Sequence, residues 1–287
     1  MTGSVIDPRT PPARDFADRH IGPRGPQVDR MLAAIGAYDD LDALIEAAVP
    51  AAIRTARPLD LPPARTEAQV LTALRGLAAE NRPLATMIGQ GYYGTVTPAV
   101  IRRNVLESPA WYTSYTPYQA EISQGRLEAM LTFQQMVEDL TALPVAGASL
   151  LDEATAVAEA VTLMWRAAKN KPGTVVLDAD LFAQSIAVVR GRAQGIGLPV
   201  VVADLSAGLP QVEGDLIGVV VQQVGASGRL HDVARVVEAA HARGALVTVA
   251  ADLLALTMLA APGDLGADVA AGSAQRKRSL NSMQSMI

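Results

Sequence analysis

Residues 174–204 read TVVLDADLFAQSIAVVRGRAQGIGLPVVVAD, and this segment indicates the fold class. It opens with a valine-rich run at 174–178, continues through a helical segment at 181–194 and closes with a second valine-rich run at 199–204. Short apolar runs without polar alternation are typical of strands that are buried on both faces. A strand, a helix and another strand in this order predict two parallel neighbours in one sheet.

The same alternation continues toward the C-terminus. Apolar runs at 216–223 and 245–252 and a weaker run at 267–272 predict three more strands, and the pattern at 229–243 predicts a helix between the first two. The sequence therefore predicts an α/β fold with a parallel-rich sheet and helices on both faces.

The residues before this region favour helices. The Pro- and Arg-rich segment 1–24 predicts an extended arm, and short helices follow it, so an N-terminal helical arm is expected before the sheet region. A capping-box-like start at Ser149 to Asp152 precedes a helix whose apolar residues share one face. The other helices are predicted at about 25–36, 40–48, 66–80 and 118–141.

The last eleven residues, KRSLNSMQSMI, break the α/β pattern, because they offer neither a strand nor a helical stripe. They could be an ordinary frayed terminus. We favour a chain that stops in mid-domain and leaves the α/β domain incomplete at the C-terminus, because no closing element follows residue 272. The predicted organisation is an arm with helices at 1–88, an aromatic mouth segment with a long helix at 89–143, an incomplete α/β domain at 144–276 and an atypical tail at 277–287.

Composition excludes several classes of function. The net charge is −5 and no basic cluster interleaves with aromatic residues, which argues against nucleic acid as a partner. No apolar run approaches the roughly 20 residues of a membrane helix, and the N-terminus has no apolar leader segment. The absence of cysteine removes disulfides, thiolate nucleophiles and Cys-ligated zinc. We expect a cytoplasmic protein.

The three histidines do not predict a metal site. His20 lies in the arm, whereas His231 and His241 fall ten residues apart in one predicted helix. Ten residues is almost three turns, too far for both side chains to bind one ion. We interpret both as solvated helix residues and expect no metal.

Other motifs are weak. No serine lies in a Gly-x-Ser-x-Gly elbow, and the GQGYYG motif at 89–94 lacks the preceding strand that a dinucleotide site requires. Asp252 ends a buried strand, where α/β sheets bind ligands, but it could equally cap a helix. Glu121 and Glu128 lie on one helix face and are interpreted as solvated carboxylates.

The segment from Gly89 to Gly125 contains six of the eleven aromatic residues of the chain. Hydroxyl-bearing rings among Gly, Thr, Pro and Ser suit a surface that packs and still forms hydrogen bonds. The segment predicts a binding mouth or an interface rather than a core.

Several segments resemble one enzyme family. These segments are FADRHIGP, the aromatic segment GQGYYGTVTPAVIRRNVLESPAWYTSYTPYQAEISQGRLEA, ASLLDEATAVAEA, AADLLALTMLAAPGDLGADV and GSAQR. They are similar to the N-terminal half of glycine dehydrogenase (decarboxylating), the P-protein of the glycine cleavage system. The resemblance covers about residues 15–276, in order. It implies the fold-type-I, aspartate aminotransferase-like large domain of pyridoxal-phosphate enzymes.

The resemblance also implies a reaction. In this family pyridoxal 5'-phosphate forms a Schiff base with a lysine of the C-terminal half or of a separate second subunit. Glycine loses its carboxylate as CO2, and the aminomethyl group passes to the lipoyl arm of the H-protein. The pyridine ring acts as the electron sink, while the protein orients it and excludes water.

Residues at two positions imply that this half is a degenerate site. Arg276 stands where the working half has its lysine, and a guanidinium is not nucleophilic toward an aldehyde. The phosphate cup should contain glycine, yet the chain has Ser149, Leu150, Leu151 and Asp152 there. We therefore expect the cofactor to be held by the lysine-bearing half or partner and not by this chain.

The expected contribution of this chain is a wall of that shared site. The resemblance implies that Tyr92, Tyr93, Tyr115 and Gln119 contact substrate, cofactor or lipoyl arm. An alternative is that these residues only fill the interface between the halves.

Three interpretations of the whole chain remain open. The first is a component of glycine decarboxylase that is inactive without its lysine-bearing partner. The second is a non-catalytic module that docks such a partner or the lipoyl carrier. The third is an unstable remnant without a role, whose uncovered sheet edges would promote aggregation.

Overall fold

The structure is a computed structural model that describes residues 16–20, 22–55, 57, 59–91, 94, 96–112, 120–147, 149–274 and 285–286. The chain divides into two compact units, Met1–Ala85 and Thr86–Ile287. Within the described ranges, no helix is both long and apolar enough to cross a membrane.

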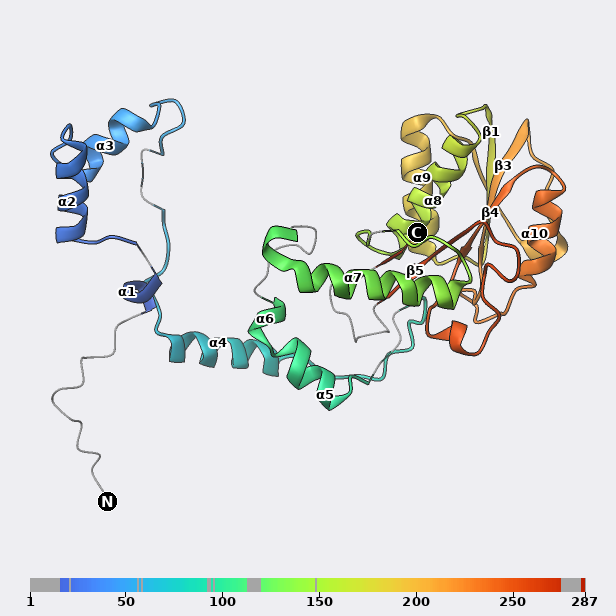
Figure 1. Cartoon of the computed structure of the whole chain (residues 1–287), viewed down its shortest axis with the longest axis horizontal. Helices are drawn as coiled ribbons and strands as arrows, with labels where there is room; N and C mark the ends of the chain where they lie inside the picture. The colour runs from blue at the N-terminus through green and yellow to red at the C-terminus, as the bar shows by residue number, and fades with distance from the viewer. Residues whose placement is uncertain are drawn as a thin grey trace, which may run out of the picture. The chain divides into compact units, whose positions relative to one another are not determined.

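The first unit is helical. Its helices are α1 (Phe16–His20), α2 (Pro26–Ile35), α3 (Leu41–Ala48) and α4 (Glu67–Ala79), shown in blue to cyan in Figure 1. The three helices predicted here are confirmed to within one residue at each end, whereas the extended arm predicted over 1–24 is wrong at α1. Local capping sets their starts: the Asp40 side chain accepts from Ala43 N at the start of α3, and Thr66 and Gln69 form a capping box at α4.

The second unit begins with more helices. These are α5 (Ala99–Ile101), the π-helical turn η1 (Arg102–Leu106), α6 (Pro109–Tyr112) and α7 (Ala120–Thr141). The predicted long helix is confirmed over the described part of its range. Phe133 and Val137, four residues apart on one face of the helix, are buried, and the helix ends where Ala142 adopts a positive φ of 54°.

A single sheet forms the centre of this unit. Its strands are β1 (Gly173–Asp178), β2 (Val200–Ala203), β3 (Asp215–Gln222), β4 (Leu246–Ala250), β5 (Val269–Ser273) and β6 (Ser285–Met286), in the order β2-β1-β3-β4-β5-β6. Neighbours among the first five strands pair in parallel, so the predicted parallel-rich sheet is confirmed.

The terminal segment differs from its prediction at one point. No strand is predicted within residues 277–287, but Ser285–Met286 pairs antiparallel with β5, with Gly272 opposite Met286. The edge of β5 offers unpaired backbone groups, and a two-residue partner needs no apolar pattern to satisfy them.

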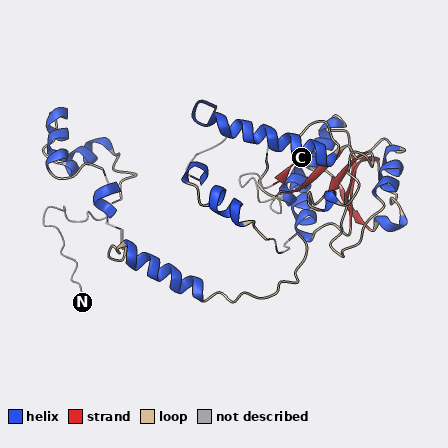
Figure 2. Cartoon of the chain, turned by 60° about the horizontal axis from the view of Figure 1, so that its bottom comes forward, coloured by secondary structure: helices blue, strands red, loops and turns tan. Residues whose placement is uncertain are grey.

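Helices cover both faces of the sheet. They are α8 (Glu153–Ala167), α9 (Ala183–Ile196) and α10 (Val233–His241), with the short 3-10 turns η2 (Leu205–Ala207) and η3 (Ala255–Thr257). Figure 1 shows α8 and α9 on one side of the strands and α10 on the other. Figure 2 shows the same enclosure of the strands by helices.

Two apolar clusters fill the space between the layers. Val176, on β1, packs with α10 and α7, whereas the next residue, Leu177, packs with α8 and α9. Successive side chains of a strand point to opposite faces, and both faces are covered here. This explains why the strands read as continuous apolar runs.

The strand order reverses between β1 and β3. The chain passes from β1 outward to β2 and then returns to β3 on the other side of β1. Connections at such a switch point leave the sheet in opposite directions, and a crevice forms at the carboxyl ends of the two strands. The candidate site lies at this edge.

Candidate functional site

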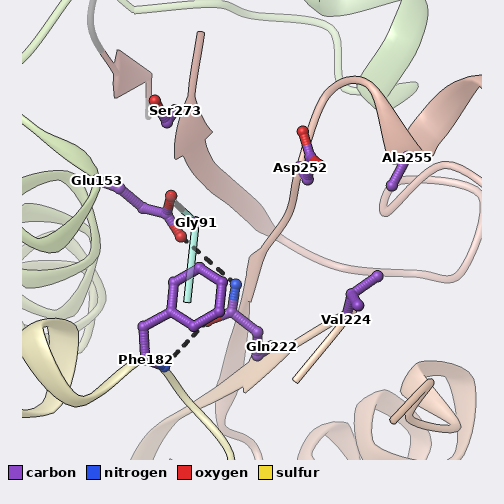
Figure 3. A pocket seen from close by; sticks show the side chains of 8 residues that line it. All are labelled: Gly91, Glu153, Phe182, Gln222, Val224, Asp252, Ala255 and Ser273. Carbon is purple, nitrogen blue, oxygen red and sulfur yellow. Dashed lines mark hydrogen bonds between the residues drawn. The ribbon is translucent and has the colours of Figure 1, made fainter. Parts of the chain in front are cut away.

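A cavity of about 260 Å³ lies at the carboxyl edge of the sheet. Its walls come from the residues that follow β1, β3 and β4, from the end of β5, from the start of α8 and from the GQGYYG motif. The lining residues, all labelled in Figure 3, are Gly91, Glu153, Phe182, Gln222, Val224, Asp252, Ala255 and Ser273.

Gln222 connects two walls of the cavity. This almost fully buried residue at the end of β3 accepts a hydrogen bond from Phe182 N through Oε1 at 3.4 Å. Its Nε2 donates to Oε1 of Glu153 at 3.4 Å, as the dashed lines in Figure 3 show. A buried amide needs partners at both ends, and here it ties α8 to the β1–α9 connection.

The GQGYYG motif reaches the cavity through its first three residues. Gln90 and Gly91 have φ values of 50° and 86°, and Gln184 Nε2 donates to Gln90 O at 3.1 Å. A Cβ added at Gly91 would meet the Phe182 ring at 3.3 Å. Gly91 thus supplies both a left-handed backbone and the space for close approach to the ring.

The start of α8 differs in one detail from its prediction. The helix is capped by Asp152, whose Oδ1 accepts from Thr155 N at 2.7 Å, and not by Ser149. Ser149 and Leu150 are half-buried and Leu151 is exposed, with Leu150 packed against the α8–α9 side of the core. The helix terminus, where an anion could bind, therefore already holds a carboxylate of the chain itself.

The structure does not test the predicted mouth residues. Tyr92, Tyr93, Tyr115 and Gln119 lie outside the described residues, as does Arg276. Their predicted roles stay predictions. Asp252, which the sequence left open between a ligand and a cap, both lines the cavity and accepts from Leu254 N at 3.1 Å.

The interpretation of His231 as a solvated helix residue is wrong. Helix α10 begins only at Val233, because Asp232 caps it by accepting from Arg235 N, so His231 lies in the preceding loop. Its side chain is 4% exposed and lies between Asp178 and Asp180. His241, at the end of α10, is 43% exposed and contacts Asp268. The sequence held one indication of this cluster, the two aspartates Asp178 and Asp180 at the end of a buried strand.

The two carboxylates beside His231 titrate differently. Burial raises the pKa of Asp178, and the backbone hydrogen bonds and His231 only partly offset this. Burial also acts against ionisation of Asp180, but hydrogen bonds from His231 and Ser227 outweigh it and lower its pKa. Among the described residues, no group of three or more His, Asp or Glu side chains is placed to hold a metal ion.

Comparison with known proteins identifies close similarity to one family. The family model of the glycine cleavage system P-protein matches residues 18–278. A crystal structure of glycine decarboxylase (P-protein) of the glycine cleavage system, in inhibitor-bound form, is 34% identical, with a TM-score of 0.80. The match covers 92% of this chain and 61% of that chain, so this chain spans about three fifths of the length of that relative.

Two other solved structures are similar at low identity. The SepCysS-SepCysE N-terminal domain complex is 15% identical with a TM-score of 0.50, covering 74% of this chain and 58% of that chain. The cysteine desulfurase CsdA from Escherichia coli is 15% identical with a TM-score of 0.49, covering 67% and 50%. The predicted fold class, an aspartate aminotransferase-like α/β large domain, is confirmed by the parallel sheet and by the match to the P-protein structure.

Proposed function

The chain belongs to the glycine cleavage system P-protein family, and we propose on this basis that it is the N-terminal component of a glycine decarboxylase. The proposed reaction is the decarboxylation of glycine with transfer of the aminomethyl group to the lipoyl group of the H-protein. The observation that carries the proposal is the family match over residues 18–278. A cavity at the carboxyl edge of the sheet, where α/β folds bind ligands, supports it.

The family uses pyridoxal 5'-phosphate, which supplies an electron sink when bound. The described residues of this cavity do not fit that group. Glu153 lines the cavity at the start of α8, next to the capping carboxylate of Asp152. Two carboxylates at the terminus where a phosphate would bind repel a dianion. We propose that the cofactor is held by a lysine-bearing partner.

The lysines of the chain support this division of roles. Only three occur in the sequence, Lys169, Lys171 and Lys277. Lys169 and Lys171 follow α8, directly before β1, at the amino edge of the sheet and opposite to the cavity. Arg276 stands at the position that resembles the lysine of the working half, and its guanidinium remains protonated.

The proposed role of this chain is to form one side of the shared active site. The ring of Phe182, whose backbone N–H donates to the buried Gln222 amide, lies against Gly91 in the lining of the cavity. Tyr92, Tyr93, Tyr115 and Gln119 are proposed to contact substrate, cofactor or lipoyl arm. Aromatic walls of this kind exclude water from a reacting centre.

Reconstitution tests the proposal. The chain, a lysine-bearing C-terminal P-protein component and their mixture are assayed for exchange of labelled bicarbonate into the carboxyl group of glycine, with lipoylated H-protein and pyridoxal phosphate present. We expect exchange from the mixture and none from this chain alone. Exchange by this chain alone would show that it holds the cofactor, and a mixture no more active than the partner would contradict a catalytic component.

A direct binding measurement separates the alternative function. In a pull-down with immobilised lipoylated H-protein, a docking module retains the carrier without any lysine-bearing partner. A component of the enzyme requires the partner for retention. Retention without the partner, combined with an inactive mixture, would favour the docking module.

A further inference from the structure

The His231 imidazole is buried in the loop that joins β3 to α10. Its Nε2 donates to Asp180 Oδ2 at 2.9 Å, and its Nδ1 lies 3.4 Å from Asp178 Oδ2. Asp178 ends β1 and Asp180 lies in the β1–α9 connection, whereas His231 follows β3. A side chain from the loop after β3 therefore contacts two carboxylates at the end of β1, across the point where the strand order reverses.

The loop at 225–231 closes on Asp180 through its backbone as well. Ala226 N donates to Asp180 O at 2.8 Å, Ser227 N donates to Oδ1 at 2.9 Å, and Ser227 Oγ donates to Oδ2 at 2.8 Å. Gly225 leaves room for this arrangement, because a Cβ there would lie 1.8 Å from Asp180 Oδ2. Asp180 is thus held by donors from a single loop, and His231 completes the set.

The β1–α9 connection held in this way also contacts the first residues of the GQGYYG motif. Phe182 lies two residues after Asp180, and its ring is the surface against which Gly91 rests. Gln184, two residues further, donates to Gln90 O. Contacts therefore run without a break from the buried imidazole to the backbone of the motif.

We infer that His231 is a positioning residue: held between Asp178 and Asp180, it fixes the β1–α9 connection and thereby the Phe182 ring on which Gly91 rests. Without the imidazole, Asp180 would keep its hydrogen bonds from Ser227, but the ring between Asp180 Oδ2 and the buried Asp178 Oδ2 would be gone. The connection would have to move to admit water, and Phe182 would move with it. The importance of this contact between Phe182 and Gly91 for catalysis rests on the proposed function, but the position of the Phe182 ring can be tested without any reaction.

Fluorine NMR of the full chain provides the test, because the chain has only three phenylalanines, Phe16, Phe133 and Phe182. Labelling with 4-fluorophenylalanine gives three resonances, and the variants Phe182→Leu and Phe133→Leu assign those of Phe182 and Phe133. Phe133 is buried on the other face of the sheet and serves as an internal control. The matched control variant is His241→Leu, which removes another histidine with an aspartate partner, Asp268, at the start of β5.

In His231→Leu we expect the Phe182 resonance to shift or broaden, with the Phe133 resonance unchanged. His231→Gln should restore most of the original shift, because its amide can donate to Asp180 from the position of Nε2. His241→Leu should leave the Phe182 resonance in place. An unchanged Phe182 resonance in His231→Leu would overturn the inference, as would equal changes at Phe133 and Phe182, which indicate a general loss of packing.

Two milder variants cover the case in which His231→Leu does not fold. Ser227→Ala removes one hydrogen bond to Asp180 at a partly solvated position and keeps the imidazole. Gly225→Ala crowds Asp180 Oδ2 from the same loop. We expect each variant to displace the Phe182 resonance while that of Phe133 stays in place. If neither variant moves the Phe182 resonance, the loop does not fix the ring and the inference is refuted.

Discussion

Asp152 Oδ1 accepts a hydrogen bond from Thr155 N at 2.7 Å, so the positive end of α8 is occupied by a carboxylate of its own chain. In related folds a helix terminus at the carboxyl edge of a sheet is a ready anion site. Here that site is already satisfied, and Glu153 beside it places a second carboxylate at the cavity. This relationship underlies the proposal that the cofactor is held elsewhere.

Asp152→Ala should lower the free energy of unfolding by about 1 kcal/mol, because the first turn of α8 loses its cap. Asp152→Asn is the matched control, since its amide oxygen can still accept from Thr155 N. Urea denaturation followed by circular dichroism measures both variants. Equal stability of the alanine variant and the wild type would show that the cap contributes nothing.

Asp180→Asn should change how stability depends on pH. The pKa of Asp180 is lowered from its usual 3.8 in the folded chain, because hydrogen bonds from His231 and Ser227 outweigh burial. Its ionised form therefore contributes stability that is present above about pH 4 and is lost as pH falls through the lowered pKa. We expect the variant to be less stable than the wild type at pH 6, with a difference that narrows toward pH 3.

Denaturation midpoints at several pH values, for Asp180→Asn and wild type in parallel, measure this difference. Asp178 acts in the opposite sense, because burial raises its pKa and its cost to stability disappears as pH falls. Asp180→Asn also removes one of the smaller causes that raise the pKa of Asp178, so the two carboxylates do not titrate independently. A difference that grows toward low pH would contradict a lowered pKa of Asp180.

Gly272→Ala and Gly191→Ala should have opposite effects. A Cβ at Gly272, in β5, would lie 2.0 Å from the carbonyl oxygen of Ala251, and relief of this overlap should cost about 1–3 kcal/mol. Gly191 is exposed within α9 and has open space, so alanine there should stabilise the chain by up to about 1 kcal/mol. Thermal unfolding of the two variants checks the contrast, and similar melting temperatures would contradict it.

Gly91→Ala and Gly94→Ala compare the third and the last residue of the GQGYYG motif. Gly91 has φ +86° and abuts Phe182, so alanine strains the backbone by about 1–2 kcal/mol and presses on the ring. Gly94 has nothing within 4 Å of an added Cβ. In the reconstituted exchange assay we expect roughly tenfold lower kcat/KM for Gly91→Ala and little change for Gly94→Ala. Equal kcat/KM values for the two variants would argue against a role for the contact between Gly91 and Phe182.

The first five strands and the longer helices of this protein could be predicted from its sequence, whereas β6 and the short helices α1, α5 and α6 could not. Strands such as 174–178 were predictable because residues buried on both faces must be continuously apolar, and helix starts because local caps such as Thr66 with Gln69 act within one turn. The resemblance carried by the motifs gave the family, which the match over residues 18–278 confirms.

Only the tertiary structure decided the geometry of the site. Asp180 and His231 are 51 residues apart, and nothing in the local pattern around His231 distinguishes it from a solvated histidine. They meet because the strand order reverses between β1 and β3, which brings the loops after both strands to one edge of the sheet. Local periodicity reports which face of an element is buried, whereas contacts between distant loops depend on how the strands are ordered.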